Sequence, residues 1–343
     1  MRILITGGAG FIGCNLAHRL LARGHRVTVF DNLSRPRTPY NLDWLELFAD
    51  DAPGALAFIR GDVRDARAVA AAADGVEAIV HLASQVAVTS SVQDPRTDFE
   101  VNALGTFNVL EAARRNPARP AVLYASTNKV YGGMEELAIV EEPTRYRYRD
   151  LPHGVAETQP LDFHSPYGCS KGAGDQYVRD YHRIYGLPTV VFRQSAIYGP
   201  RQFGVEDQGW AAHFVIAAQT GRPITIYGDG KQVRDMLYID DLIDLYELAL
   251  DRMDVVAGQI YNVGGGPANS LAIWSEFQPL LSRLAGHPIA PARFGPWRPG
   301  DQRVCVLDIR KAERELGWRP QVGLEQGMAR LWQWVADHRD LFQ

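Results

Sequence analysis

Residues 1–16 read MRILITGGAGFIGCNL and decide the fold. Arg2–Thr6 is a short apolar run that is typical of a buried strand, and the residues after the glycines have the spacing of an amphipathic helix. Gly7, Gly10 and Gly13 lie between these two elements at regular intervals. This spacing permits a tight turn, close approach of the backbone to a pyrophosphate and close packing of helix against strand. The stretch therefore predicts a strand–turn–helix unit that binds a dinucleotide.

A carboxylate at the end of the second predicted strand supports this interpretation. Asp31 lies 18 residues after Gly13, where its side chain can accept hydrogen bonds from the adenosine ribose hydroxyls. Because Asp31 would repel a 2′-phosphate, NAD is favoured over NADP, although Arg35 and Arg37 lie nearby in the sequence. The alternative is a plain strand–turn–helix with a surface aspartate.

Short apolar runs alternate with helical stretches through the first two-thirds of the chain. Continuous apolar runs are typical of strands buried on both faces, and the alternation favours a parallel, doubly wound α/β sheet. We expect strands at Arg2–Thr6, Arg26–Phe30, Ala57–Arg60, Ala78–Leu82, Ala121–Ala125 and Thr189–Arg193. We expect helices at Phe11–Ala22, Asp65–Ala73, Asp98–Arg115 and Tyr167–Tyr185.

The sequence pattern changes after about residue 195, where short strands and helices are mixed with many Gly and Pro turns. The expected strands are Ile224–Tyr227 and Gln259–Val263, and the expected helices are Gly209–Thr220, Asp240–Asp251, Ser270–Ala285 and Leu324–Ala336. We therefore predict a cofactor-binding domain at 1–195 and a smaller α/β substrate lobe at 196–343, interleaved with the first. Segment 133–165 has no clear period, and a loop of that length is functional or disordered.

The ends of the predicted strands give further candidates for the cofactor site. Sheets of this kind bind ligands at the carboxyl ends of their strands, where the strand order reverses. Asp62 and Val63 follow the third strand, and Leu82–Gln85 follows the fourth. Both segments are expected to line the cofactor site, with ordinary loop structure as the alternative for each.

A tyrosine and a lysine four residues apart are the candidate catalytic pair. Tyr167 and Lys171 lie on the same face of a predicted helix, one turn apart. An ammonium beside a phenol lowers the pKa of the phenol from about 10, so Tyr167 would act as a general base on a sugar hydroxyl. Ser126 and Thr127 end the fifth strand, where a hydroxyl can hydrogen-bond the reacting oxygen. The alternatives are an exposed helix pair and ordinary residues at a strand end.

Composition excludes several other functional classes. The chain has 343 residues, 46% of them hydrophobic, with 36 Lys and Arg against 40 Asp and Glu, a net charge of −4. That balance argues against a nucleic-acid or membrane-surface partner, and no apolar run is long enough for a transmembrane helix. The 3 cysteines are far apart, which argues against disulfides and suits a cytoplasmic location. The 9 histidines lack the spacing of metal ligands, so no metal site is expected.

The motifs described above together resemble those of the extended short-chain dehydrogenase/reductases that act on nucleotide sugars. The likeness covers nearly the whole chain and continues through 198–201, 226–235, 298–301 and 316–320. It implies a Rossmann domain that binds NAD and a C-terminal lobe that binds a nucleotide diphosphate-sugar. It also implies a homodimer formed through two helices, for which 98–115 and 167–185 are the candidates.

Several segments look like one subfamily, the CDP-tyvelose (CDP-paratose) 2-epimerases, which implies a CDP-sugar substrate. They are 126–132, 161–172, 207–210 and the loop around 142–146. The related 4,6-dehydratases carry Asp-Glu directly after the catalytic threonine, whereas this chain has Asn128 and Lys129. An amide cannot act as a general acid, so dehydration is disfavoured. Ala196 also departs from the family, because many relatives hold a substrate-contacting asparagine there.

The motifs and the likeness together give a set of expected site residues. The catalytic residues are Thr127, Tyr167 and Lys171. The cofactor contacts are Gly7, Gly10, Phe11, Ile12, Gly13, Asp31, Asn32, Ser34, Arg35, Asp62, Val63, Leu82, Ala83, Gln85, Asn102, Ser126, Tyr167 and Lys171. The substrate contacts are Asn128, Gln208, Gly209, Gln232, Arg234, Arg298, Asp301 and Arg303.

The resemblance implies inversion at C2 of a CDP-hexose with no net redox change. Thr127 would orient the C2 hydroxyl, Tyr167 would take its proton, and a hydride would pass to tightly held NAD and back to the opposite face of a transient 2-keto sugar. One alternative is a C4 epimerase or a decarboxylase that acts on another nucleotide sugar. The other is a non-catalytic NAD-sensing module, because a fold does not fix a function.

Overall fold

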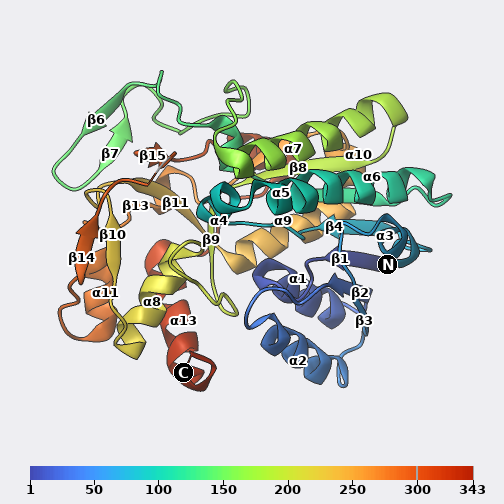
Figure 1. The fold of residues 1–343 in the computed structure, drawn as a ribbon, viewed down its shortest axis with the longest axis horizontal. Helices are drawn as coiled ribbons and strands as arrows, with labels where there is room; N and C mark the ends of the chain where they lie inside the picture. The colour runs from blue at the N-terminus through green and yellow to red at the C-terminus, as the bar shows by residue number, and fades with distance from the viewer. Residues whose placement is uncertain (299, 343) are drawn as a thin grey trace. The chain divides into compact units, whose positions relative to one another are not determined.

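The computed structural model describes residues 1–298 and 300–342; Pro299, which belongs to one of the motifs above, and Gln343 lie outside the described residues. The chain forms two compact units, each built from separate stretches (Figure 1). The first unit contains residues 1–130, 165–193 and 243–261. The second unit contains residues 131–164, 194–242 and 262–343.

The first unit is built on a seven-stranded sheet with the order β12-β8-β5-β4-β1-β2-β3. Strand β1 pairs in parallel with β2 on one side and with β4 on the other, so the strand order reverses at β1. The strands are β1 Arg2–Thr6, β2 Arg26–Asp31, β3 Ala55–Arg60, β4 Ala78–His81, β5 Ala121–Thr127, β8 Thr189–Gln194 and β12 Ile260–Val263. The predicted doubly wound α/β sheet is thereby confirmed.

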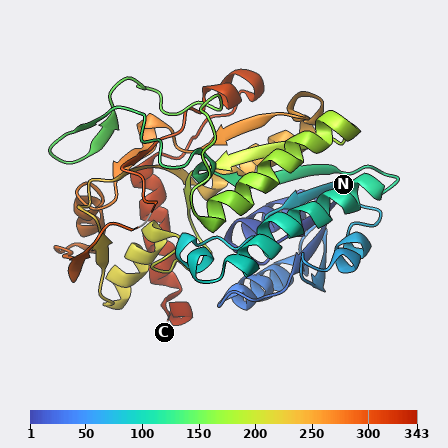
Figure 2. The same cartoon turned by 45° about the horizontal axis from the view of Figure 1, so that its top comes forward.

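Helices cover both faces of this sheet (Figure 2), and its inner strands β1, β4, β5 and β8 are buried on both sides as such a cover requires. The helices α1 and α2 pack together, and α6 packs against both α3 and α7 over a core that includes Leu4, Val109, Val122 and Val178. The helices are α1 Phe11–Ala22, α2 Thr38–Ala49, α3 Ala66–Ala72, α4 Val88–Gln93, α5 Pro95–Phe99, α6 Gly105–Arg115, α7 Ser165–Tyr185, α9 Ile239–Asp251 and α10 Met253–Val256.

One expected helix is interrupted. The periodicity predicts a single helix at Asp98–Arg115, but a π-helical turn at Glu100–Leu104 separates α5 from α6. Such turns occur frequently at functional sites because they redirect side chains that a regular helix would space evenly. Here the turn contains Asn102, whose side chain is buried.

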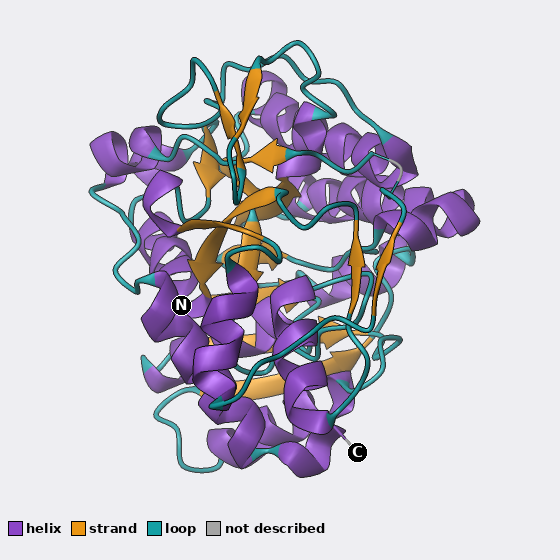
Figure 3. Cartoon of the chain, turned by 90° about the vertical axis from the view of Figure 1, so that its left-hand side faces the viewer, coloured by secondary structure: helices purple, strands orange, loops and turns teal. Residues whose placement is uncertain are grey.

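In its described residues the second unit contains short strands and the α-helices named below (Figure 3, which views the side of β10 and β14). A central strand, β11, pairs with β13, β15 and β9, while β10 pairs with β14 and β6 pairs with β7 as a hairpin. The strands are β6 Ile139–Glu141, β7 Tyr146–Tyr148, β9 Ala196–Tyr198, β10 Thr225–Tyr227, β11 Val233–Tyr238, β13 Ser270–Ala272, β14 Arg293–Gly295 and β15 Val304–Cys305. The helices are α8 Trp210–Thr220, α11 Phe277–Ala285, α12 Arg310–Leu316 and α13 Leu324–Asp337.

Two expectations for the C-terminal third are corrected. The helix expected at Ser270–Ala285 begins as strand β13, because Ser270–Ala272 pairs with β11, and only Phe277–Ala285 is helical. The strand expected in the small lobe at Gln259–Val263 is β12, which lies at the edge of the large sheet instead.

Among the described residues, no helix combines the length and the apolar character that a membrane span requires. The cytoplasmic location stays a prediction.

Candidate functional site

The glycine turn after β1 is packed so closely that no side chain fits at Gly7 or Gly13. Gly7 has φ +71°, and a Cβ atom added there would lie 2.6 Å from the backbone nitrogen of Ala83. A Cβ atom on Gly13 would lie 2.4 Å from the carbonyl oxygen of Gly7. The turn is held by a 2.8 Å hydrogen bond from the Gly7 N–H to the carbonyl of Phe30. These contacts permit only glycine, and they leave backbone open at the start of α1, as a pyrophosphate requires.

No side chain of the described residues caps the start of α1 at Gly10, and Phe11 and Ile12, which begin the helix, are partly exposed. The first N–H groups of a helix have no partner within it, so an anion satisfies them and meets the positive end of the helix dipole. The predicted residues from Gly7 to Gly13 therefore form one cradle that fits a dinucleotide phosphate.

Asp31 ends β2 beside this cradle. Its carboxylate accepts hydrogen bonds from the N–H groups of Ala9, at 3.1 Å, and Leu33, at 2.8 Å. Burial raises the pKa of Asp31, while those hydrogen bonds and the charge of Arg35 act in the opposite direction. The carboxylate is thus fixed at the carboxyl end of β2, as recognition of a ribose requires.

The loops after β2 and β3 are joined. The amide of Asn32 donates to Asp62 at 2.9 Å, and the N–H of Ser34 donates to Asn32 at 2.9 Å. Hydrogen bonds from Arg64 hold the pKa of Asp62 down to about 2, so this carboxylate is charged, and it is already hydrogen-bonded to Arg64 and Asn32. Val63, the next residue, is buried.

The segment after β4 lies directly against the glycine turn. The N–H of Leu82 donates to the carbonyl of Thr6 at 3.0 Å, which places Ala83 against Gly7. Gln85 is fixed by the buried Asn102, whose side chain accepts from the Gln85 N–H at 2.9 Å and donates to its carbonyl at 3.0 Å. The structure therefore brings the predicted cofactor residues of β1, β2 and β4 to one edge of the sheet.

The candidate catalytic pair is buried at the same edge. Tyr167 and Lys171 are one turn apart on α7, and the Nζ atom of Lys171 donates to the carbonyl of Ala125 at 2.6 Å. The same Nζ atom lies 4.3 Å from the centroid of the Tyr124 ring. A hydrogen-bonding interaction also links the Tyr167 phenol to Thr127. Thr127, at the end of β5, therefore lies beside Tyr167, and Lys171 lies one turn along α7 from Tyr167, as the strand end and the helical spacing predict.

The pKa of Tyr167 is shifted in the direction opposite to the expectation. Burial raises the pKa of Tyr167 to about 12, and the interaction with Thr127 offsets only part of that rise. Burial lowers the pKa of Lys171 to about 7. The expected lowering of the phenol pKa by the ammonium is not seen in the chain alone, because Lys171 is directed at Ala125 and Tyr124.

A buried ion pair that the sequence did not indicate supports this site. Arg193 on β8 binds the carboxylate of Asp175 through two hydrogen bonds of 2.9 Å. The hydroxyl of Ser126 donates to the same carboxylate at 2.7 Å, so the hydroxyl proton of Ser126 is already engaged within the protein. Asp175 lies four residues after Lys171 on the same face of α7, and that spacing is the signal that could have identified it.

The predicted substrate residues lie in the second unit, except for Asn128, which accepts from the Thr127 hydroxyl at 3.2 Å. Arg234 donates to Asp301 at 2.5 Å, so these two predicted residues form an ion pair. Gln232 is fully buried and its Nε2 atom donates to the carbonyl of Tyr227 at 2.6 Å.

Aromatic rings lie beside the other two predicted arginines, Arg298 and Arg303. The sequence did not indicate these contacts. The guanidinium of Arg298 lies 4.0 Å from the ring centroid of Tyr227. That of Arg303 lies 5.4 Å from the ring of Tyr146 and 5.8 Å from that of Trp297. Rings and guanidinium groups together offer stacking for a base and bidentate hydrogen bonds for phosphate oxygens.

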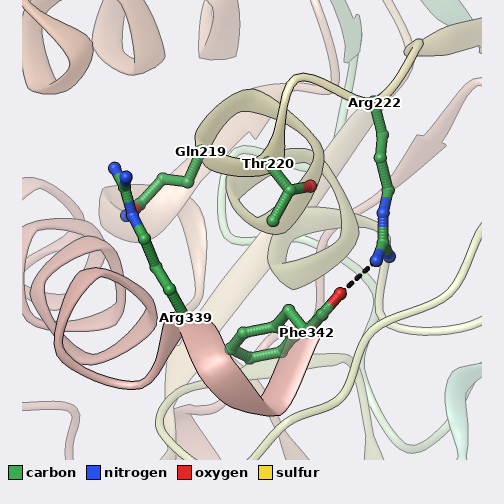
Figure 4. A pocket seen from close by; sticks show the side chains of 5 residues that line it. All are labelled: Gln219, Thr220, Arg222, Arg339 and Phe342. Atoms are coloured by element: carbon green, nitrogen blue, oxygen red, sulfur yellow. Dashed lines mark hydrogen bonds between the residues drawn. The ribbon is translucent and has the colours of Figure 1, made fainter.

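Gln208 and Gly209 precede α8 in the same unit. Val205 and Gln208 exchange backbone hydrogen bonds of 2.9 and 3.0 Å, and Gly209 has φ +75° where the helix begins. These two residues therefore form a fixed turn. A separate cavity of about 280 Å³ lies at the other end of α8 (Figure 4). It is lined by Gln219, Thr220, Arg222, Arg339 and Phe342, which differ from all the predicted site residues.

Comparison with known proteins adds sequence and structural relatives to this geometry. The model of the NAD dependent epimerase/dehydratase family matches residues 3–264. CDP-paratose 2-epimerase from Salmonella typhi is 44% identical over 343 aligned positions, and the alignment covers 98% of this chain and 99% of that protein.

Two solved structures share the fold. UDP-glucose 4-epimerase from Thermotoga maritima, solved with UDP-glucose, has a TM-score of 0.83 and 30% identity, covering 98% of this chain and 99% of that one. A dTDP-glucose 4,6-dehydratase from Streptomyces venezuelae, solved with NAD and TDP, has a TM-score of 0.84 and 33% identity, covering 99% of this chain and 98% of that one.

Proposed function

Because the chain belongs to the NAD dependent epimerase/dehydratase family, we propose that it inverts C2 of a CDP-hexose of the paratose and tyvelose type. It is an enzyme with NAD as cofactor and a nucleotide sugar as substrate. The single observation that carries the finer assignment is the 44% identity, over 98% of the chain, with a CDP-paratose 2-epimerase.

The residues after Thr127 support epimerisation over dehydration. Asn128 accepts a hydrogen bond from the Thr127 hydroxyl, and the Lys129 N–H donates to the same hydroxyl at 3.2 Å. An amide and an ammonium at these positions do not form the acid–base pair that would expel a sugar hydroxyl and remove a carbon-bound proton. Their contacts hold Thr127 in place instead.

The cradle from Gly7 to Gly13 and the carboxylate of Asp31 would hold the cofactor. NAD, when bound, supplies the acceptor and donor of a hydride and a positively charged ring. Thr127 would orient the C2 hydroxyl of the sugar. Tyr167, whose phenol would ionise beside the positive charges of the bound cofactor ring and of Lys171, would accept the proton of that hydroxyl and later return it. Lys171 holds the nicotinamide ribose through its ammonium group. The sugar thus passes through a 2-keto state and rotates in the site between the two hydride transfers, so that its opposite face is presented to the cofactor.

The second unit is proposed to hold the nucleotide. Arg234, Arg298 and Arg303 are guanidinium groups of the kind that bind a diphosphate bidentately. Asp301, now paired with Arg234, is assigned to a ribose hydroxyl, and the rings of Tyr227 and Trp297 offer stacking for a base. The remaining assigned contacts are Asn128, Gln208, Gly209 and Gln232.

Incubation with CDP-, UDP- and GDP-sugars in D₂O without added NAD tests the assignment. We expect inversion at C2 of a CDP-hexose, read by NMR of the sugar, with no deuterium at C2, because the hydride returns from the cofactor without exchanging with solvent. Inversion at C4, or a preference for UDP-sugars, would support the C4 epimerase. Deuterium at C2 would contradict hydride shuttling.

We also propose that the enzyme is a homodimer formed through α6 and α7. These adjacent helices carry exposed large apolar side chains, namely Leu104 just before α6, Phe107, Tyr177, Ile184 and Tyr185, and Phe107 and Tyr177 are in edge-to-face contact at 6.2 Å. Clustered exposed apolar side chains mark interaction sites, and a symmetric dimer would cover this face with its own copy.

Phe107→Glu tests the dimer. We expect it to weaken self-association about 30-fold or more, which corresponds to about 2 kcal/mol, because two carboxylates would be buried at one symmetric contact. Light scattering during gel filtration distinguishes the 38.1 kDa chain from its dimer. The matched control is Leu47→Glu, at another exposed apolar residue on α2. A wild-type chain that stays monomeric at micromolar concentration would rule the dimer out.

A further inference from the structure

The hairpin formed by β6 and β7 has no role in the function as described above. Its second strand, β7, carries Tyr146 and Tyr148, which are buried at 5% and 7% exposure. Residues two apart on a strand project to the same face of it, so the two side chains belong to one face of the hairpin. The groups that this face contacts indicate what the hairpin does.

Both tyrosines contact the segment that begins at Arg303, where β7 and β15 lie side by side (Figure 1). The guanidinium of Arg303 lies 5.4 Å from the centroid of the Tyr146 ring, and the hydroxyl of Tyr148 donates to the carbonyl of Val304 at 2.9 Å. The carbonyl of Arg303 accepts from the N–H of Val233 on β11 at 2.9 Å. The main chain at 303–304 is therefore bound to both β7 and β11.

The charge of Arg303 differs from that of the other two predicted arginines in having no carboxylate beside it. Arg234 pairs with Asp301 at 2.5 Å, and Arg298 pairs with Asp207 at 3.5 Å. Among the residues that the structure describes, no carboxylate pairs with Arg303, which is exposed beside two aromatic rings. A phosphate has to compete with a carboxylate for the first two guanidinium groups, whereas it meets no such competitor at Arg303.

The Tyr146 ring is held at its hydroxyl, at its main chain and through the preceding residue. The hydroxyl donates to Asp229 at 2.5 Å, and the N–H of Tyr146 donates to the carbonyl of Lys231 at 3.1 Å. Arg145 binds the carboxylate of Glu276 through two hydrogen bonds of 2.8 and 2.5 Å. The ring is therefore a fixed surface, whereas the arginine side chain beside it is long and rotatable.

We propose that Tyr146 is a positioning residue that holds the guanidinium of Arg303 in the orientation that binds the diphosphate of the nucleotide sugar. A guanidinium within about 6 Å of a ring centroid is attracted to the ring. A side chain that is already oriented loses less conformational freedom when it binds an anion. The role rests on the proposed function, which assigns Arg303 to the nucleotide, and it makes the hairpin part of the nucleotide site.

A double-mutant cycle tests whether Tyr146 acts through Arg303, with the affinity of the NAD-loaded enzyme for CDP measured by titration calorimetry. We expect Arg303→Met to weaken binding about 10-fold or more, because a hydrogen bond between two charged groups is lost. Tyr146→Leu should weaken binding about 5-fold or more. In the Arg303→Met background the same change should alter binding by less than about 2-fold. Equal losses in both backgrounds, or an unchanged affinity in Tyr146→Leu, would overturn the proposal.

Tyr146→Phe is the conservative control, since it keeps the ring and removes only the hydroxyl. We expect it to retain most of the affinity that Tyr146→Leu loses, because the ring stays beside Arg303 and its other anchors remain. A loss as large as that of Tyr146→Leu would contradict the proposal. Glu276→Gln provides a second route that leaves the ring intact, since it weakens the attachment of Arg145. It should weaken CDP binding with Arg303 present and not in the Arg303→Met background.

Turnover separates this role from simple structural support. We expect Tyr146→Leu to raise the KM for the nucleotide sugar and to leave kcat within about 2-fold of wild type, because the diphosphate is bound alike before and during the reaction. A lower kcat with an unchanged KM would count against the proposal.

Repeating the cycle with UDP separates this role from the proposed function. Tighter binding of UDP than of CDP would contradict the CDP assignment and leave the coupling between Tyr146 and Arg303 in place. Absence of that coupling with both nucleotides would overturn the positioning role and leave the reaction assignment untouched.

Discussion

Tyr167→Phe is expected to lower kcat by about 10²–10⁴-fold, the range that a positioned general acid–base group contributes. The change removes one oxygen atom from a ring that is already buried, so packing at the start of α7 is preserved. The phenol is the group beside Thr127 that can exchange a proton with a sugar alcohol. Turnover should be measured with saturating nucleotide sugar, where binding no longer limits the rate.

The control for this variant is the amount of NAD that stays bound to each chain. NAD released by denaturing the purified protein should equal the wild-type amount per chain, because the cradle from Gly7 to Gly13 is untouched. A chain that loses turnover and NAD together would mean that the phenol acts mainly through its predicted contact with the cofactor and not as the base. A chain that keeps full turnover would exclude Tyr167 as the base.

Arg193→Met is expected to lower the free energy of unfolding by about 3–5 kcal/mol. The side chains of Arg193 and Asp175 are 3% and 0% exposed, and two hydrogen bonds of 2.9 Å join them. Removing the guanidinium leaves a buried carboxylate whose remaining side-chain donors, which include Ser126, are uncharged. Denaturation by urea, followed by circular dichroism, gives the change in stability.

A surface ion pair provides the matched comparison. Arg283 and Glu325 are 2.7 Å apart, with side chains 61% and 77% exposed. Because water screens such a pair, Arg283→Met should change stability by less than about 1 kcal/mol. Similar losses in Arg193→Met and Arg283→Met would mean that burial does not make the Asp175–Arg193 pair important.

Sequence reasoning succeeded where local chemistry alone decides the structure. The strand at Arg2–Thr6 and the helix at Phe11–Ala22 have the predicted bounds. An apolar run, a glycine turn and a helical period that follow one another along the chain determine where each element begins and ends. The face shared by Tyr167 and Lys171 was also predictable, because residues four apart on a helix are neighbours.

The features that the sequence did not predict depend on packing between distant segments. Helical spacing places Lys171 on the face of Tyr167, but the direction of its ammonium depends on the carbonyl of Ala125, on another element. The buried position of Asp98 has no sequence signal, since its hydrogen-bond partners come from α7 and from a π-helical turn that interrupts the expected helix. At Ser270–Ala272, pairing with β11 outweighs the helical period.

The interleaving of the two units has a consequence for protein engineering. A gene cut near codon 195 yields two fragments, and neither contains a whole unit. The N-terminal fragment lacks residues 243–261 of the first unit, and the C-terminal fragment lacks residues 131–164 of the second unit. A chimera that transfers nucleotide preference between family members must therefore exchange three separate stretches together. Single-crossover recombination between such genes should give mostly insoluble product.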